Sequence, residues 1–189
     1  MKNYEIIKQE CTRFNTARQA LIKAEADISN DKLLSDAGKA TKRAEARKAF
    51  YEATDGLLDA MTIAAEAIDK NITEHNAYID YKSPELMEAL DFIRVSSVVP
   101  DSVATSMIGK LTLPAELNLL AANLEGKCLS GSMDATAKAQ DAIITPISED
   151  VDRAWFAYQE PTTEAARDVF SSIENSANYV AVALDGAEE

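Results

Sequence analysis

The single histidine, His75, is the first residue whose side chain could do acid–base chemistry. An imidazole there could act as a general base or as a pH switch. It falls in register with Ile68, Ile72 and Ile79 on the apolar stripe of an expected helix. No nucleophile or paired-carboxylate motif accompanies it in the sequence. We therefore interpret His75 as a polar side chain at a helix–helix contact, where it tunes the register.

Clustered carboxylates are the second candidate, because they could bind a hard cation. Two groups occur in the sequence: Glu149, Asp150 and Asp152, and the pair Glu164 and Asp168. The first group lacks the alternating spacing and the glycine of an EF-hand loop. It follows Ser148 directly, which is typical of acidic residues at a helix N-terminus, where the helix dipole favours them. A single histidine also excludes a multi-histidine site within one chain, so we expect no metal.

Motifs for phosphate binding and for hydrolysis are incomplete. Gly109 and the lysine after it resemble the end of a phosphate loop, but Ala104 and Leu111 stand where the motif requires glycine and Ser/Thr. Residues 130–132 do not form a nucleophile elbow. We therefore expect no catalytic residue and no cofactor. An enzyme of unrecognised type is the least favoured of the alternatives.

The two cysteines, Cys11 and Cys128, are too few for a disulfide scaffold, so we expect both to be reduced and half-buried. No window approaches the roughly 18 apolar residues of a membrane-spanning helix. The first eight residues intersperse charged and apolar side chains, unlike a signal peptide. We expect a soluble cytoplasmic protein, or a virion component if it is a viral structural protein.

Charge is distributed unevenly along the 189 residues, which carry 19 basic and 32 acidic side chains for a net charge of −13. Residues 1–82 hold 13 basic and 14 acidic side chains, whereas residues 83–189 hold 6 and 18. This acidity argues against direct binding to nucleic-acid phosphates or to a membrane of anionic lipid. A local basic run is the exception, with members Lys39, Lys42, Arg43, Arg47 and Lys48. We interpret it as a solvated helix face, or as a dock for an acidic surface that a second copy could supply.

The elements that must position these residues are helices. Apolar side chains recur at spacings of three and four over residues 3–28 and again over 39–81, which predicts two helices. We expect the second helix to be continuous and to absorb Gly56, at a cost of about 1 kcal/mol relative to alanine. The two would form an antiparallel, coiled-coil-like hairpin. The uncovered half of the longer helix would pack on the rest of the chain or on another subunit.

Residues 83–189 carry helix start and stop signals at short intervals. Ser83 can cap a helix that begins at Pro84, and this pair marks the expected boundary between the segments 1–82 and 83–189. The segment around Val98 is a connector or a fraying helix end. Further helices are expected over 101–108, 114–124, 133–144, 148–159 with Ser148 as its cap, and from Thr162 or Thr163 to about 184. The predicted fold is therefore all-α: a long helical hairpin followed by a compact bundle of short helices.

The densest aromatic group, at positions 155–158, could be core or an interface anchor, and the sequence favours neither. Candidate interface residues lie on the long stripe and in this group: Tyr51, Leu58, Met61, Ile68, Ile72, His75, Ile79, Trp155, Phe156 and Tyr158. The function expected is non-enzymatic assembly or adaptation through protein partners or self-association, with a homo-oligomer or a larger assembly as the product. A virus- or phage-type structural accessory is one form of it. The alternative is an acidic inhibitor, or a nucleic-acid-mimicking decoy for a basic partner.

Overall fold

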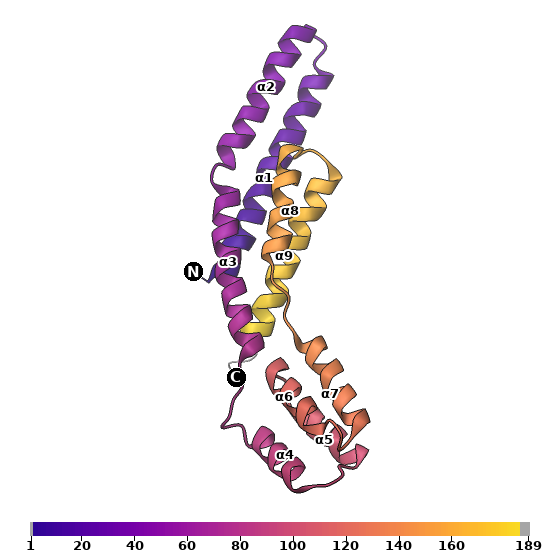
Figure 1. The fold of residues 1–189 in the computed structure, drawn as a ribbon. Coiled ribbons are helices and arrows are strands. Elements are labelled where there is room, and N and C mark those ends of the chain that lie inside the picture. The colour runs from indigo at the N-terminus through magenta and orange to yellow at the C-terminus, as the bar shows by residue number, and fades with distance from the viewer. Residues whose placement is uncertain (1, 186–189) are drawn as a thin grey trace. The chain divides into compact units, whose positions relative to one another are not determined.

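The chain folds into helices, with no strand, over residues 2–185, which its computed structural model describes (Figure 1). The helices are α1 (Asn3–Asn30), α2 (Asp36–Ala53), α3 (Leu57–Ala77), α4 (Pro84–Val95), α5 (Asp101–Lys110), α6 (Pro114–Leu124), α7 (Leu129–Ala142), α8 (Ser148–Gln159) and α9 (Glu164–Asp185). This confirms the expected all-α fold of a helical hairpin and shorter helices. The bounds of α6 and α8 coincide with those expected from the sequence, and the ends of the other short helices differ by a few residues.

Two compact units divide these helices. Unit 1 combines residues 1–70 with residues 146–189, and unit 2 comprises residues 71–145. The boundary expected at Ser83 therefore lies inside unit 2. The reason is that α9 packs against α1 and α8 packs against α9. These two later helices therefore belong to the same unit as α1. Acidic residues occur in both units: ten lie in residues 146–189 of unit 1, and ten lie in unit 2.

The long helix expected over residues 39–81 is present as two successive helices, α2 and α3, because the backbone is interrupted and bends between them, and it ends at Ala77. The N–H of Thr54 still donates to the carbonyl of Phe50 at 3.1 Å. Two residues later Gly56 has a φ of +70°. Side chains other than glycine rarely adopt that conformation, so Gly56 ends one helix and permits the next to start in a new direction.

Basic side chains hold α2 against α1 in the hairpin. The Nζ of Lys39 donates to the carbonyl of Ser29 at 3.0 Å, and Arg43 donates to the Oγ of the same serine at 3.0 Å. One turn further, Nε of Arg47 lies 3.3 Å from a carboxylate oxygen of Glu25. These three cations recur every four residues and therefore share one face of α2. Much of the basic run is thus directed toward α1.

Unit 1 is a bundle in which α8 and α9 lie beside α1 and α3 (Figure 1). Asp69 of α3 binds the N-terminus of α8. Its carboxylate accepts hydrogen bonds from the N–H groups of Ile147 at 2.7 Å and Ser148 at 3.2 Å. These are N–H groups that the start of a helix leaves without a partner. The expected cap by Ser148 is therefore wrong, since Ser148 is the first helical residue and Asp69 supplies the acceptor.

Unit 2 packs α4–α7 around its own apolar core. The buried members include Leu86, Ile93, Val99, Ala104, Ile108, Leu117, Leu120, Leu124 and Ala135. As expected, Ser83 caps α4, its Oγ accepting the N–H of Leu86 at 3.3 Å. Gly131 lets α7 approach α5, because a Cβ there would lie 2.6 Å from that of Ala104. Among the helices described in either unit, none is long and apolar enough to cross a membrane.

Candidate interaction surface

Aromatic side chains from four helices meet inside unit 1. Phe14 of α1 and Phe170 of α9 stack with ring centroids 3.6 Å apart, and Phe50 of α2 meets Phe14 edge-on at 5.9 Å. All three are buried. Tyr158 of α8 lies 5.7 Å from Phe50 and 5.6 Å from Tyr51. Since Tyr51 is 42% exposed, the cluster runs from the core to the surface and joins α2 to α8.

The helix break after α2 is tied to α8 by hydroxyl groups. Oγ1 of the buried Thr54 donates to the carbonyl of Phe50 at 2.8 Å. The Tyr158 hydroxyl lies 2.6 Å from the same Oγ1. Because Thr54 has one hydroxyl hydrogen and has given it to Phe50, Tyr158 is the donor in this second bond. Tyr158 therefore fixes where α8 meets the junction of α2 and α3.

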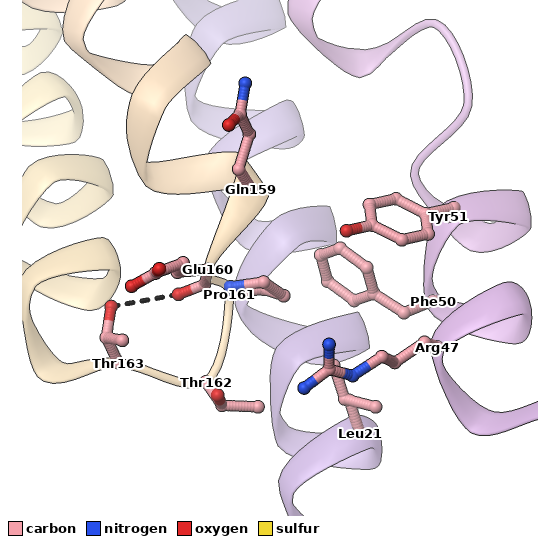
Figure 2. Close-up of a pocket in the computed structure, with 9 residues that line it drawn as sticks. All are labelled: Leu21, Arg47, Phe50, Tyr51, Gln159, Glu160, Pro161, Thr162 and Thr163. Carbon is pink, nitrogen blue, oxygen red and sulfur yellow. Dashed lines mark hydrogen bonds between the residues drawn. The ribbon is translucent and has the colours of Figure 1, made fainter. Parts of the chain in front are cut away.

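A cavity of about 280 Å³ opens beside this cluster, between α1, α2 and the turn that joins α8 to α9 (Figure 2). Leu21 and Phe50 form its apolar side, and Pro161 of the turn lies opposite the ring of Phe50. Two polar side chains of α2 also line the cavity, the guanidinium of Arg47 and the phenol of Tyr51. The site therefore combines an apolar wall with a guanidinium and a phenol, which suits a side chain that is apolar with a polar end.

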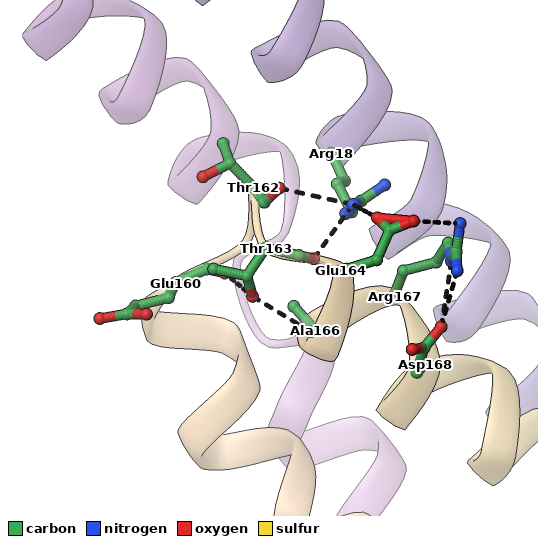
Figure 3. A network of polar contacts seen from close by, with 8 residues as sticks. All are labelled: Arg18, Glu160, Thr162, Thr163, Glu164, Ala166, Arg167 and Asp168. Carbon is green, nitrogen blue, oxygen red and sulfur yellow. Dashed lines mark hydrogen bonds and ion pairs between the residues drawn. The ribbon is translucent and has the colours of Figure 1, made fainter.

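The turn itself is held by a buried arginine of α1 (Figure 3). Nη2 of Arg18 donates to the carbonyl of Thr163 at 3.0 Å and to that of Thr162 at 3.5 Å. Its ion pair with Glu164 spans 3.9 Å, and the arginine side chain is 6% exposed. Oγ1 of Thr163 then accepts the N–H of Ala166 at 3.2 Å, which caps α9 as expected. The cavity wall is thus fixed by hydrogen bonds.

A second, shallow hollow lies along the outer side of α2, and we call it the α2 hollow. It is lined by Ala44, Arg47, Lys48, Tyr51, Glu52 and Asp55. Arg47 and Tyr51 also line the cavity, so the two depressions adjoin. Phe50 is the only fully buried residue of α2, an 18-residue helix. Most of the surface of α2 is therefore available to a partner.

The exposed side of α8 carries bulky aromatic side chains, and we call it the α8 face. It consists of Glu149, Asp152, Trp155 and Phe156. Phe156 is 80% exposed and Trp155 is 46% exposed. The opposite side of α8 holds the buried Val151 and Ala154. Since Trp155 stands one helical turn before Tyr158, the α8 face adjoins the aromatic cluster and, through Tyr51, the α2 hollow.

The other candidate residues fall in different surroundings. Leu58, Met61, Ile68 and Ile72 are at most 6% exposed, so their side chains are buried by this chain itself. His75 is partly exposed near the end of α3. Ile79 packs against the core of unit 2. The structure thus brings together the candidates Tyr51 and Tyr158, whose rings lie 5.6 Å apart, while Trp155 and Phe156 are exposed on the same helix as Tyr158.

Sequence reasoning assigned Arg47 and Lys48 to the basic run but did not connect them with Ala44, Tyr51 and Asp55. Ala44 and Lys48 of α2 line the α2 hollow together with Asp55, which lies just after the helix. The signal was present in the spacing, because Ala44, Tyr51 and Asp55 are separated by seven and four residues. We did not recognise this spacing, because we assigned Ala44 and Tyr51 to an apolar stripe that continues to Ile79 along one unbroken helix.

The two cysteine thiols lie outside this surface, and their surroundings raise the pKa of each. Burial raises the pKa of Cys11 from 9.0 to about 12, and nearby Glu174 and Glu10 act in the same direction. Cys128 donates to a carboxylate oxygen of Asp101 at 3.0 Å, which raises its pKa. In the described part of the chain, no group of histidine, cysteine and carboxylate side chains is arranged to hold a metal ion.

Comparison with known proteins finds no matching family model, no matching curated protein and no matching solved structure.

Proposed function

We propose that this protein is a non-enzymatic assembly or adaptor protein that acts through the surface formed by the α8 face and the α2 hollow. The observation that carries the proposal is the pair Trp155 and Phe156, exposed next to each other on one helix. Phe14, Phe50 and Phe170 of the same unit are packed inside. Aromatic side chains at a surface lose little conformational entropy on binding and supply large contact areas, so they dominate many interfaces.

Rigidity of α8 supports this role. Asp69 binds the N-terminus of the helix, Tyr158 binds its other end, and Val151 and Ala154 anchor its middle. A partner therefore meets aromatic side chains on a helix whose backbone is already ordered, which reduces the entropy lost on association. The cavity beside Tyr51 and Arg47 offers a receptacle for one side chain of that partner.

A virus- or phage-type structural accessory protein is one form of this function. Such a protein would work in the cytoplasm during assembly or remain in the virion. It needs no catalytic group, metal or cofactor, and it would contact protein rather than nucleic acid or membrane. Exposed aromatic side chains flanked by charged ones, as on the α8 face, have the chemistry that such a contact requires.

Photo-crosslinking tests the proposal directly. The full chain would be produced in its native host with benzoylphenylalanine at position 156, and separately at position 33, where Leu33 is 97% exposed in the α1–α2 loop. We expect discrete protein adducts at position 156 that weaken when Trp155 is changed to alanine. No adduct at position 156, or the same adducts at both positions, would contradict the proposal.

An acidic decoy for a basic partner is the second candidate. Its support is the segment 146–189, which holds ten acidic residues and only two arginines. Both arginines are paired with acidic neighbours, Arg153 with Asp150 at 3.1 Å and Arg167 with Glu164 at 2.7 Å. Binding to a basic protein should then weaken steeply with added salt, and binding that is insensitive to salt would exclude this function.

A further inference from the structure

The cavity between α1, α2 and the α8–α9 turn has an apolar floor of core side chains. Leu21 and Phe50 are 2% and 3% exposed, and Pro161 of the turn is buried. The cavity volume of about 280 Å³ is nearly twice the roughly 150 Å³ of a cavity that holds one benzene molecule. The space therefore suits a ligand of about ten non-hydrogen atoms.

Arg47 offers this cavity one free edge of its guanidinium. Its Nε lies 3.3 Å from a carboxylate oxygen of Glu25. The other edge, formed by Nη1 and Nη2, has no hydrogen-bond or ion-pair partner in the described part of the chain. Figure 2 shows the guanidinium extending from α2 toward Thr162 and Pro161 of the turn. Two N–H groups at such an edge match the two oxygens of a carboxylate.

Two hydroxyl groups also line the cavity and are available to a ligand. The Oη of Tyr51 and the Oγ1 of Thr162 have no hydrogen-bond partner among residues 2–185. Either hydroxyl can donate to an anionic oxygen. Glu160 is the acidic residue of the lining, and Figure 2 shows its carboxylate on the side of the turn away from Arg47. The charge that faces the cavity is therefore positive.

We propose that this cavity binds an apolar monocarboxylate. The carboxylate pairs with Nη1 and Nη2 of Arg47, and the apolar body lies against Leu21, Phe50 and Pro161. The hydrogen bonds from Arg18 to the turn already hold the opposite wall in place, which lowers the entropy lost on binding. One guanidinium balances one negative charge, which favours a carboxylate over a phosphate group.

Two sources share this chemistry: a free small acid, and the C-terminal residue of a partner protein when that residue is apolar. The second source rests on the proposed function, because it makes the ligand part of the protein that the surface binds. The first source is independent of the proposed function. The shared chemistry predicts that the free carboxylate is required in both cases.

An NMR titration of the full-length chain, labelled with nitrogen-15, tests the proposal. Phenylacetate is the probe, because it joins one ring to one carboxylate at the size of the cavity. We expect a Kd on the order of 0.1–1 mM, with the amide shifts confined to the residues that line the cavity. Phenylacetamide has the same shape without the charge, so it should bind at least about tenfold more weakly.

A pair of arginine variants shows whether binding depends on the cavity. Arg47→Gln should weaken the binding of phenylacetate by at least about tenfold, because the charged edge is lost. Arg43→Gln is the matched control, since Arg43 is an exposed arginine of α2 that bonds to Ser29 of α1 and does not line the cavity. It should bind phenylacetate as the wild type does, and both variants should keep the wild-type thermal midpoint.

Two short glycine-rich peptides that end in phenylalanine separate the sources, one with a free C-terminal carboxylate and one with a C-terminal amide. Tighter binding of the free-carboxylate peptide than of phenylacetate supports a chain terminus as the ligand, and the reverse order supports a free acid. The proposal is overturned by no shift with any probe, by equal binding of phenylacetate and phenylacetamide, or by unchanged binding in Arg47→Gln. Crosslinking at position 156 can still succeed in each of these cases, so the assembly function would stand without this site.

Discussion

The hydroxyl of Tyr158 on α8 lies 2.6 Å from Oγ1 of Thr54, at the end of α2, across 104 positions of sequence. This bond holds the surface helix α8 to the break between α2 and α3. The ring of Tyr158 also lies 5.6 Å from that of Tyr51, which is 42% exposed, so the same side chain links the surface of α2 to α8. The interaction surface therefore depends on a contact that also belongs to the core.

Replacing Tyr158 by phenylalanine should lower the free energy of unfolding by about 1 kcal/mol, the usual value of one intramolecular hydrogen bond. The ring contacts with Phe50 and Tyr51 would remain. Urea denaturation followed by circular dichroism gives the measurement. Tyr179→Phe is the matched control, because Tyr179 is 59% exposed, and it should change stability little. Equal losses in both variants would show that the bond to Thr54 does not stabilise the fold.

Replacing Arg18 by alanine should destabilise unit 1 by about 2–3 kcal/mol, because two backbone carbonyls of the α8–α9 turn lose a charged donor. Arg18→Lys should cost less, since an ammonium group can still reach one carbonyl. The control is Arg153→Ala, whose side chain is 64% exposed in its ion pair with Asp150. That change should stay within about 0.5 kcal/mol of the wild type. Thermal denaturation of the three variants would contradict this account if Arg18→Ala matched Arg153→Ala.

Glu116 of unit 2 makes stability depend on pH. It is 3% exposed and accepts the N–H of Asp80 at 3.0 Å. Burial raises its pKa, aided by the carboxylates of Asp80 and Glu85 and opposed by that hydrogen bond. The folded state therefore holds a proton more tightly than the unfolded state, and stability falls as the pH rises from the ordinary carboxyl pKa of 4.5 through the raised value.

Glu116→Gln should accordingly raise the free energy of unfolding at neutral pH and reduce its decline across the mildly acidic range. The amide oxygen of glutamine can still accept the bond from Asp80. Denaturation curves collected from acidic to neutral pH would test this. For Glu88→Gln, at an exposed position of α4, the free energy of unfolding should depend on pH in the same way as for the wild type. The same dependence on pH for Glu116→Gln would contradict the role assigned to Glu116.

Both cysteines should resist thiol reagents in the native protein. Cys11 has no exposed surface and a pKa of about 12, and Cys128 is 6% exposed with its thiol bonded to Asp101. Reaction requires an accessible thiolate, which neither provides. We expect no colour with a disulfide reagent until denaturant is added, and then two thiols per chain. A Lys23→Cys variant supplies an exposed control, and rapid native labelling of Cys11 or Cys128 in the wild type would contradict the prediction.

Local signals made much of the fold predictable. The start of α4 at Pro84 after Ser83 and the start of α6 at Pro114 follow from capping residues and helix breakers that act within one turn, and α1 ends two residues beyond the predicted residue 28. The period of three and four also identified the helices. Gly56 was misjudged because a glycine within a helical pattern has the same sequence signature whether the helix continues through it or ends there.

Contacts between distant segments could not be predicted. Asp69 binds the start of α8 across 78 positions, and Arg18 binds the α8–α9 turn across more than 140. Neither residue is distinguished locally from other charged residues on a helix. The exposed state of Phe156 was equally hidden, because helical spacing gives the angle of a side chain around its own helix but not which side another helix covers. The candidate Tyr51 was named from its place on the apolar stripe, and Trp155 and Phe156 from the density of aromatic residues, so the contact between Tyr51 and Tyr158 could not be predicted.

Photo-crosslinking of the full-length chain at position 156, with position 33 as the control, tests the central claim most directly. We predict discrete protein adducts at position 156 that weaken when Trp155 is changed to alanine, while the thermal midpoint of the Trp155→Ala variant stays close to the wild-type value because Trp155 is 46% exposed. No adduct at position 156, or the same adducts at both positions, would contradict assembly through the α8 face.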